Sequence, residues 1–234
     1  MIILAIDTST MTGSVAITED RTLLAEITLN IRETHESRLM KTIDSVFQAT
    51  KLTPQEIDLF AVGVGPGSFT GLRISLATVK ALALATQKPV VGISSLKASA
   101  ARFFCDSSFF CPILDARKGE IYTALFRRKE QQLEQLLPDT AIAPQQAFEQ
   151  IKEITRDQPI LFWGSGSLLY KGLIEECFAA PAVFPPLIEP SGATVAYLGW
   201  QKWQQTKQDE LQTILPNYLR KSEAEIKWAA RSNQ

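Results

Sequence analysis

The sequence predicts an α/β protein of two lobes, each a mixed β-sheet flanked by helices. The chain opens with three strand-like segments, after which helices and strands alternate up to about residue 104. The pattern then restarts with two strands and a helix. A strand, a glycine-rich turn and a helix follow one another in both halves, at residues 59–85 and 159–177. This recurrence is the reason for predicting two lobes.

The first lobe is expected to span residues 1–104. Its first three strands form an antiparallel meander whose first turn carries an acid and three hydroxyl residues. Its helices are recognised by apolar residues at helical spacing. The expected elements are strands at 2–6, 14–18 and 23–29, a helix at 36–50, a strand at 59–62, a helix at 72–85, a strand at 89–93 and a helix at 94–103.

The second lobe is expected to span residues 105–190. Its elements are strands at 112–115 and 120–126, a polar stretch through Gln135, a helix at 145–154, a strand at 159–163, a helix at 167–177 and a run of Pro and Ala at 177–190 that leads back between the lobes. We expect a helix at 191–207, capped by Ser191, to complete the first lobe. Residues 208–234 form the tail, whose polar part from Pro216 onward we expect to be loose.

Composition excludes several classes of function. The net charge is −1 and no block of like charges occurs, which disfavours tight binding of RNA by this chain alone or of an anionic membrane. The N-terminus lacks the basic region of a signal peptide, and the three cysteines form no close-spaced pair. We therefore expect a cytoplasmic protein with reduced thiols. His35 is the only histidine, so a zinc site with two histidines is impossible.

The glycine-rich stretch from Gly63 to Arg73 turns a strand sharply into a helix. Backbone N–H groups at such a helix start suit an anion. The stretch is not a P-loop, however, because Leu72 and Arg73 follow its last glycine. The favoured interpretation is backbone geometry and close helix packing. The helix at 72–85 is apolar on all sides, so either another layer of this chain or another protein must cover it.

Six motifs together resemble the TsaB (YeaZ) family: Asp7-Thr8-Ser9-Thr10, Arg32-x-x-His35, Gly65-Pro66-Gly67-Ser68-Phe69-Thr70-Gly71-Leu72-Arg73, Ile93-Ser94-Ser95-Leu96, Asp115-Ala116-Arg117-Lys118-Gly119-Glu120-Ile121-Tyr122 and Asn217-Tyr218-Leu219-Arg220. The resemblance covers nearly the whole chain. It implies the two-lobed actin-like, or ribonuclease H-like, fold of sugar kinases and Hsp70. It also implies a non-catalytic scaffold and activating subunit in the synthesis of N6-threonylcarbamoyladenosine at position 37 of tRNA.

The resemblance further implies a paralogous transferase, TsaD, that holds a metal through a His-x-x-x-His pair. Those two positions correspond to Ser95 and Ser99 here. Hydroxyl groups are poor ligands for a transition metal, so we expect no metal site and no transferase chemistry in this chain.

The resemblance also implies the partners. We expect a TsaD-like paralogue, a second copy of this chain when it is alone, a TsaE-like ATPase at the joint surface, tRNA only through the complex, and no membrane. Such family members pair through the helices at 36–50 and 72–85, although the residues alone also allow these helices to be internal. The expected contact residues are Leu39, Met40, Ile43, Phe47, Leu72, Leu76, Val79, Lys80 and Ala83.

Nucleotide binding is the alternative from another class of function. In actin-like ATPases an acid at the position of Asp7 handles magnesium, so a sugar-kinase-type phosphotransferase would bind ATP or ADP with Mg²⁺. The residues concerned are Asp7, Thr8, Ser9, Gly164 and Gly166. Ordinary turn chemistry explains them equally well, and we expect no firmly bound cofactor. An older name of the family suggests a metallopeptidase, but the metal ligands that such an activity needs are missing from this sequence.

Two further features stay open. The charges of the hairpin at 115–120 either face the cleft between the lobes or form a solvated turn. His35 is interpreted as a helix-entry or surface residue rather than a general base, because no titratable partner is near it in sequence.

Overall fold

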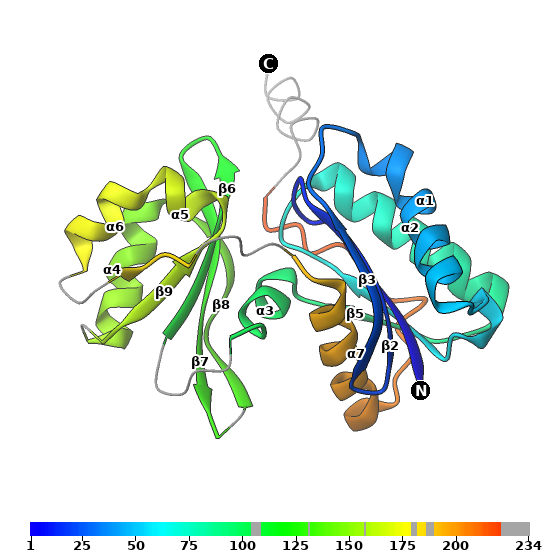
Figure 1. Ribbon diagram of the computed structural model, residues 1–234. Helices are drawn as coiled ribbons and strands as arrows, with labels where there is room; N and C mark the ends of the chain where they lie inside the picture. Colours follow the sequence, from blue (N-terminus) through cyan, green and yellow to red (C-terminus); the bar gives the residue numbers. More distant parts are fainter. Residues whose placement is uncertain (104–108, 131, 157, 179–181, 186–189, 221–234) are drawn as a thin grey trace, which may run out of the picture.

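The computed structural model describes residues 1–103, 109–130, 132–156, 158–178, 182–185 and 190–220. Two lobes lie side by side, each built on a five-stranded sheet (Figure 1). The last helix, α7 (Gly192–Thr206), returns to the first lobe. The predicted two-lobed α/β fold is confirmed.

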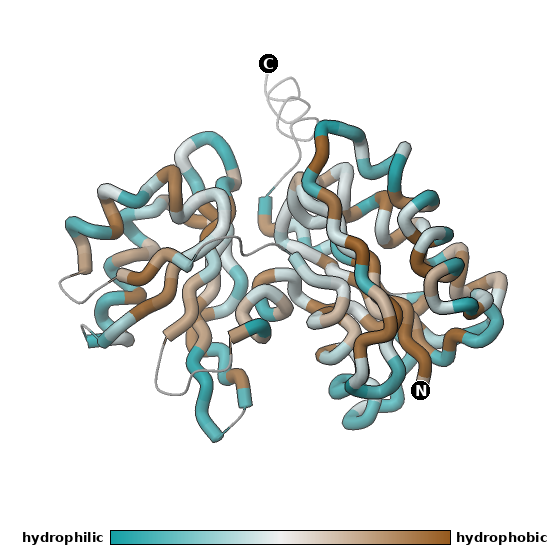
Figure 2. The backbone as a smooth tube through the Cα atoms, in the orientation of Figure 1, coloured by the Kyte–Doolittle hydropathy of each residue, from teal (hydrophilic) through white to brown (hydrophobic). Residues whose placement is uncertain are grey.

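The first sheet has the strand order β3-β2-β1-β4-β5. Its strands are β1 (Ile2–Asp7), β2 (Gly13–Glu19), β3 (Thr22–Leu29), β4 (Leu59–Gly63) and β5 (Val90–Ile93). The first three are antiparallel, whereas β4 and β5 run parallel to β1. Helices cover both faces, so β1 and β4 are continuous apolar runs instead of alternating ones, and the strand that starts at the N-terminus is brown in Figure 2.

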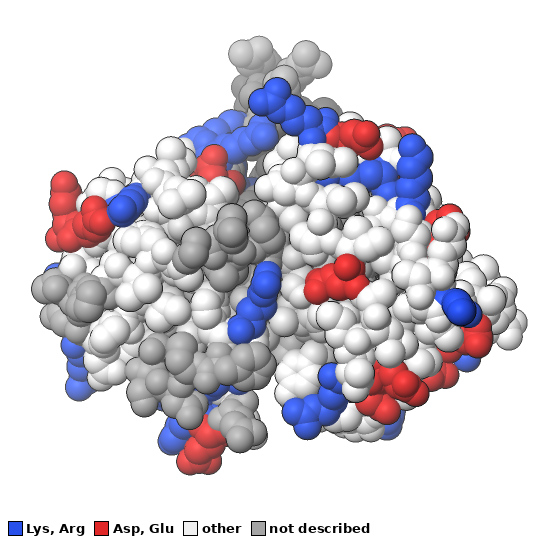
Figure 3. Space-filling model, in the orientation of Figure 1, with Lys and Arg blue, Asp and Glu red and all other residues white. Residues whose placement is uncertain are grey.

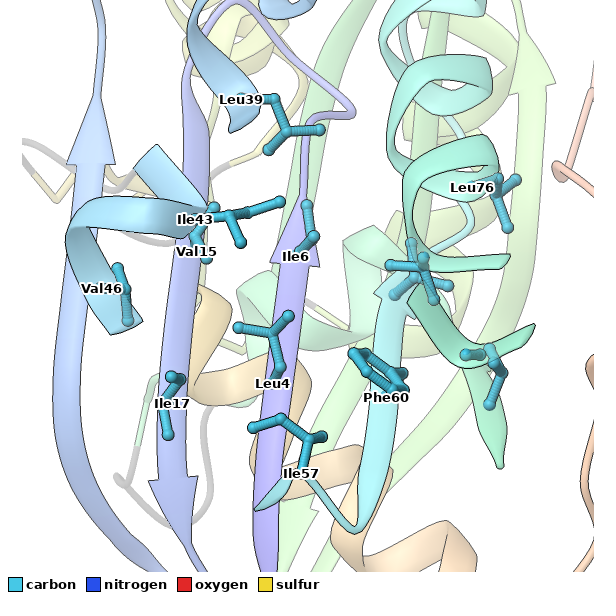
Figure 4. Close-up of a cluster of buried hydrophobic side chains, with 14 of the residues drawn as sticks. Leu4, Ile6, Val15, Ile17, Leu39, Ile43, Val46, Ile57, Phe60 and Leu76 are labelled. Atoms are coloured by element: carbon cyan, nitrogen blue, oxygen red, sulfur yellow. The ribbon is translucent and has the colours of Figure 1, made fainter. Parts of the chain in front are cut away.

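Two helices, α1 (His35–Thr50) and α2 (Phe69–Thr86), cover one face of this sheet. Thr34 and Ser68 cap their N-termini, because each side chain accepts a hydrogen bond from a backbone N–H of the first turn. Figure 4 shows apolar side chains of β1 and β2 packed beneath α1. A 3₁₀ turn (Pro54–Glu56) leads into β4.

The opposite face of the first sheet is covered by α7 and the short helix α3 (Ser95–Ala100). Ser191 caps α7 as predicted, accepting a hydrogen bond from the N–H of Thr194. The Glu26 carboxylate on β3 accepts hydrogen bonds from the Ser191 hydroxyl at 2.9 Å and the Ala193 N–H at 3.3 Å. These bonds attach the helix to a strand far away in sequence.

The second sheet has the order β10-β9-β6-β7-β8. Its elements are β6 (Phe109–Arg117), β7 (Glu120–Lys129), β8 (Gln132–Ile142), α4 (Pro144–Thr155), β9 (Ile160–Trp163), α5 (Ser165–Leu169), α6 (Lys171–Cys177) and β10 (Ala182–Val183). Phe148, Phe162 and Phe178 form the aromatic centre of its core.

Two predictions for this lobe are corrected. The polar stretch before residue 135 belongs to β8, which lies at the edge of the sheet and is half exposed, so it carries no apolar alternation. The helix predicted at 167–177 is two short helices, because Tyr170 departs from helical geometry with φ −107°. The predicted connection at 177–190 and Cys105 lie partly or wholly outside the described residues, whereas Cys111 is buried.

The segment 209–220 is held to the first lobe, and its part from Pro216 onward is not loose as predicted, because the Asn217 N–H donates to the Val64 carbonyl at 2.7 Å. Ile214 belongs to the core of the first lobe. Carboxylates of Asp209 and Glu210 accept hydrogen bonds from the N–H groups of Val90 and Gly92 at 2.9 and 2.8 Å, which closes the free edge of β5. The tail beyond residue 220 lies outside the described part of the chain.

Apolar and polar contacts join the lobes through α3. Leu96 and Ala100 of the first lobe share a core cluster with Phe110 and Trp163 of the second. The Ser94 hydroxyl also donates to the Asp139 carboxylate at 2.6 Å. The lobes are therefore held together by a common core.

Candidate functional site

The outer face of the α1–α2 layer carries an open apolar depression of about 400 Å³. Met40, which lines it, is 54% exposed, and Leu84 on α2 is 61% exposed. Exposed apolar surface of this kind is typical of protein–protein contact sites. The lining suits packing against an apolar surface of another protein and carries no group for catalysis. Its residues are Met40, Ala77, Thr78, Ala81 and Leu82.

Most side chains predicted to contact a partner point the other way. Seven of the nine are core residues at 8% exposure or less: Leu39, Ile43, Phe47, Leu72, Leu76, Val79 and Ala83. This part of the prediction is corrected, because these side chains lie on the helix stripes that face the sheet, and hydropathy alone did not indicate which stripe of α2 that is. Met40 and Lys80 remain at the surface. The outer residues Ala77 and Ala81 were missed. The spacing of Leu72, Leu76 and Val79 by four and three positions marks the stripe of α2 that faces the sheet, and these two alanines lie off that stripe.

α2 is the one helix within the described ranges whose length and hydropathy would suffice to cross a membrane. Six of its residues are buried against the first lobe. It is therefore a helix of the folded lobe with one apolar outer face.

The residues predicted to hold nucleotide at the first turn are closed off from solvent. Asp7, Thr8 and Ser9 are 1%, 1% and 2% exposed. The Asp7 carboxylate accepts a hydrogen bond from the Ser9 N–H at 2.8 Å, and the Thr8 hydroxyl donates to the Gly71 carbonyl at 2.8 Å. Burial raises the pKa of Asp7, and hydrogen bonds to Ser9 and Ser95 oppose the rise. A hydrated Mg²⁺ needs an accessible carboxylate, so these residues do not fit MgATP or MgADP.

The glycines of both turns serve close packing. A Cβ at Gly67 or Gly71 would overlap the carbonyl oxygens of Ser9 and Thr8, so the first turn and the glycine-rich stretch touch through their backbones. Gly164 has φ +98°, and a Cβ there would overlap the carbonyl of Ile113. Gly166 lies as tightly against the same strand, β6.

The two positions of the missing metal ligands make structural hydrogen bonds. The Ser95 hydroxyl accepts from the Gly65 N–H at 3.2 Å, and the Ser99 hydroxyl accepts from the Trp163 indole of the other lobe. Within the described ranges no three His, Cys, Asp or Glu side chains come together as a metal site.

His35 begins α1 and is half-buried. Its Nε2 lies 2.7 Å from the Thr10 carbonyl and therefore carries the proton, while Nδ1 accepts from Arg38 at 3.1 Å. Burial lowers the pKa of His35. Arg38 also donates to the carbonyls of Met11 and Ile31. This pair joins the loops above the first sheet, in line with the predicted helix-entry role.

Three motifs meet at the junction of the lobes. Tyr218 stacks on Phe69 at the start of α2, with ring centroids 3.9 Å apart. Two residues later, Arg220 pairs with Glu120 of the β6–β7 hairpin at 2.7 Å. The C-terminal segment therefore bridges the lobes, and the hairpin charges lie at the junction, with Arg117 and Lys118 exposed.

Solved structures of other proteins share this architecture. The chain superposes on YeaZ from Pseudomonas aeruginosa with a TM-score of 0.76 and 24% identity, covering 93% of this chain and 99% of the other. A P. aeruginosa protein described as similar to peptidase YeaZ gives a TM-score of 0.79 and 24% identity, covering 94% and 99%. The molecule thus has the YeaZ-like two-lobed α/β fold.

Related sequences identify the family to which this chain belongs within the YeaZ-like fold. Residues 22–228 match the profile of a family described as TsaD, tRNA N6-adenosine threonylcarbamoyltransferase. The chain is 34% identical to the tRNA threonylcarbamoyladenosine biosynthesis protein TsaB of Bacillus subtilis strain 168, over 97% of this chain and 98% of that protein. It is 36% identical to Escherichia coli K12 TsaB, over 56% and 57% of the two chains. The chain belongs to the TsaB proteins of this family.

Proposed function

We propose that this chain is a non-catalytic subunit of tRNA threonylcarbamoyladenosine biosynthesis that binds and activates a TsaD-like transferase. The observation that carries the proposal is the exposed apolar depression on α1 and α2, in a chain related to TsaB over nearly its full length. The hydroxyl groups of Ser95 and Ser99 support the absence of catalysis, because both hold other parts of the fold. The protein works in the cytoplasm, where the tRNA substrate of the transferase is.

The TsaD-like partner occupies the outer face of α2, and a second copy of this chain takes the same face when the partner is absent. A standard interface buries roughly 800 Å² on each side, which two helices can supply. A TsaE-like ATPase then docks where the two subunits meet. A phosphotransferase is not favoured, because Asp7 is buried.

The test is Ala81→Glu, which places a charge in the depression on an exposed position. The variant should fold normally, fail to co-elute with the TsaD-like protein and lose modified nucleoside in a reconstituted reaction. Gln146→Glu on the exposed side of α4 is the matched control and should behave as wild type. A folded Ala81→Glu variant that still binds and activates the transferase would refute the proposal.

A further inference from the structure

Basic side chains gather where the C-terminal segment bridges the lobes. Figure 3 shows Lys and Arg along the upper edge of the molecule, over both lobes. Arg73 contributes from α2, Arg117 and Lys118 from the β6–β7 hairpin, and Arg220 from the C-terminal segment. Two carboxylates, Asp115 and Glu120, belong to the same hairpin.

The hairpin holds its basic residues in an unusual backbone conformation. Arg117 and Lys118 both have positive φ, at 63° and 54°. Such left-handed geometry costs free energy for residues other than glycine, and it persists only where the surroundings impose it. Asp115 accepts a hydrogen bond from the Arg117 N–H at 2.7 Å, and Arg220 donates to the carbonyls of Ala116 and Arg117. The backbone that carries the two basic residues is therefore fixed, and their exposed side chains extend from it.

An aromatic group lies beside these cations. The Tyr218 ring is nearly parallel to that of Phe69, with an interplanar angle of 5°, and remains 37% exposed. Arg73 donates to the Tyr218 hydroxyl at 2.8 Å, which fixes the guanidinium at the surface next to the ring. Tyr218 thus offers a stacking surface adjoining a fixed positive charge.

The carboxylates at the junction do not neutralise all of these cations. Glu120 pairs with Arg220, and Asp115 keeps its charge while accepting a hydrogen bond from the Arg117 N–H, so two carboxylates lie among the four basic residues. Among the residues that the structure describes, Arg73 and Arg117 pair with no carboxylate. Elsewhere exposed cations such as Arg127 do form such pairs. Unpaired guanidinium groups are well suited to phosphate oxygens.

We propose that Arg73, Arg117, Lys118 and Tyr218 form a contact surface for the phosphodiester backbone of RNA. This inference rests on the proposed function, in which the RNA is the tRNA brought to the complex. Guanidinium groups beside an exposed aromatic ring suit RNA better than an acidic peptide, because phosphates and bases alternate along the strand. The chain contributes only a few phosphate contacts, which agrees with its net charge of −1.

The experiment measures tRNA affinity of the complex with the TsaD-like protein over a range of KCl concentrations. Arg117→Gln combined with Lys118→Gln should weaken binding and flatten the plot of log K against log salt by about 0.7 to 0.9 per lost phosphate contact. Lys152→Gln on α4 removes an exposed cation far from the junction and should leave the slope unchanged. Tyr218→Leu should lower the affinity through the loss of stacking, whereas Tyr218→Phe, which keeps the ring and loses only the hydroxyl bonded to Arg73, should keep most of that affinity.

Co-elution of the two proteins is measured on the same samples, so a failure of the proposed function is seen separately. An unchanged slope in an intact complex would overturn the inference. Loss of the complex in the double variant would also overturn it, because the surface would then contact a protein. If the wild-type proteins do not associate, the proposed function fails first, and the inference, which rests on it, fails with it.

Discussion

The two faces of α2 differ in burial and in use. The inner face carries Leu72, Leu76 and Val79, which are buried in the core of the first lobe. The outer face carries Ala77 and Ala81, which line the open depression. An apolar character on all sides thus hides two separate roles, since the stripe that faces the sheet stabilises the lobe and the opposite stripe remains at the surface. Substitutions on the inner face should therefore destabilise the lobe, whereas substitutions on the outer face should leave its stability unchanged.

The largest effect is expected from Val79→Asp. Val79 is fully buried, and an unpaired carboxylate there would cost several kcal/mol, so the first lobe should not fold. Ala81→Asp, two residues further along the same helix, introduces the same charge on the outer face and should leave thermal unfolding unchanged. Similar melting curves for the two variants would remove the distinction between the faces.

A truncation pair sharpens the comparison without adding charge. Leu76→Ala should lower the free energy of unfolding by about 2–5 kcal/mol, because it opens a cavity in the core. Leu84→Ala, at a position that is 61% exposed, should change it by less than about 0.5 kcal/mol. Urea titrations measure both values, and equal losses would contradict the assignment of faces.

The turn that starts α2 should respond to a single methyl group. Gly71→Ala would push a Cβ into the Thr8 carbonyl and should cost about 1–3 kcal/mol. Gly172→Ala in α6 meets no atom within 4 Å and should stabilise the protein by about 0.5 kcal/mol. The urea midpoint should fall for Gly71→Ala and rise for Gly172→Ala. Such opposite shifts would confirm that the contact at each position, and not the loss of a glycine as such, determines the change in stability.

The smallest effect concerns His35, where α1 begins. Burial lowers its pKa in the folded state, so the unfolded chain takes up a proton first as the pH falls below about 6.5. The contribution of His35 to the free energy of unfolding is therefore complete above that pH. It declines as the pH falls toward the lower pKa of His35 in the folded protein. Asp7 acts in the opposite sense, because its raised pKa favours the folded state as acid protonates it.

The difference between wild type and His35→Gln isolates the histidine, since Asp7 is present in both. Urea unfolding at several pH values between 7.5 and 5 should show a smaller loss of stability in the variant. Parallel pH dependences would mean that His35 does not titrate differently in the folded state.

Local patterns predicted most of the elements. The helix α1 follows from apolar residues at helical spacing, and α7 from its Ser191 cap. β8 was missed because an edge strand buries too little of either face to alternate in hydropathy. The orientation of α2 was missed for another reason: with an apolar residue at almost every position, hydropathy does not distinguish its faces, and Ala83 is buried while Leu84 is exposed.

The sequence by itself determined the two α/β lobes and the motifs that indicate the TsaB family, because these depend on local periodicity and residue type. Only the tertiary structure decided which face of α2 is outward, that Asp7 is enclosed, and that Tyr218 and Arg220 join Phe69 and Glu120 across the lobes. Such contacts join residues up to about 150 positions apart. They arise from the packing of whole elements, which no local pattern records.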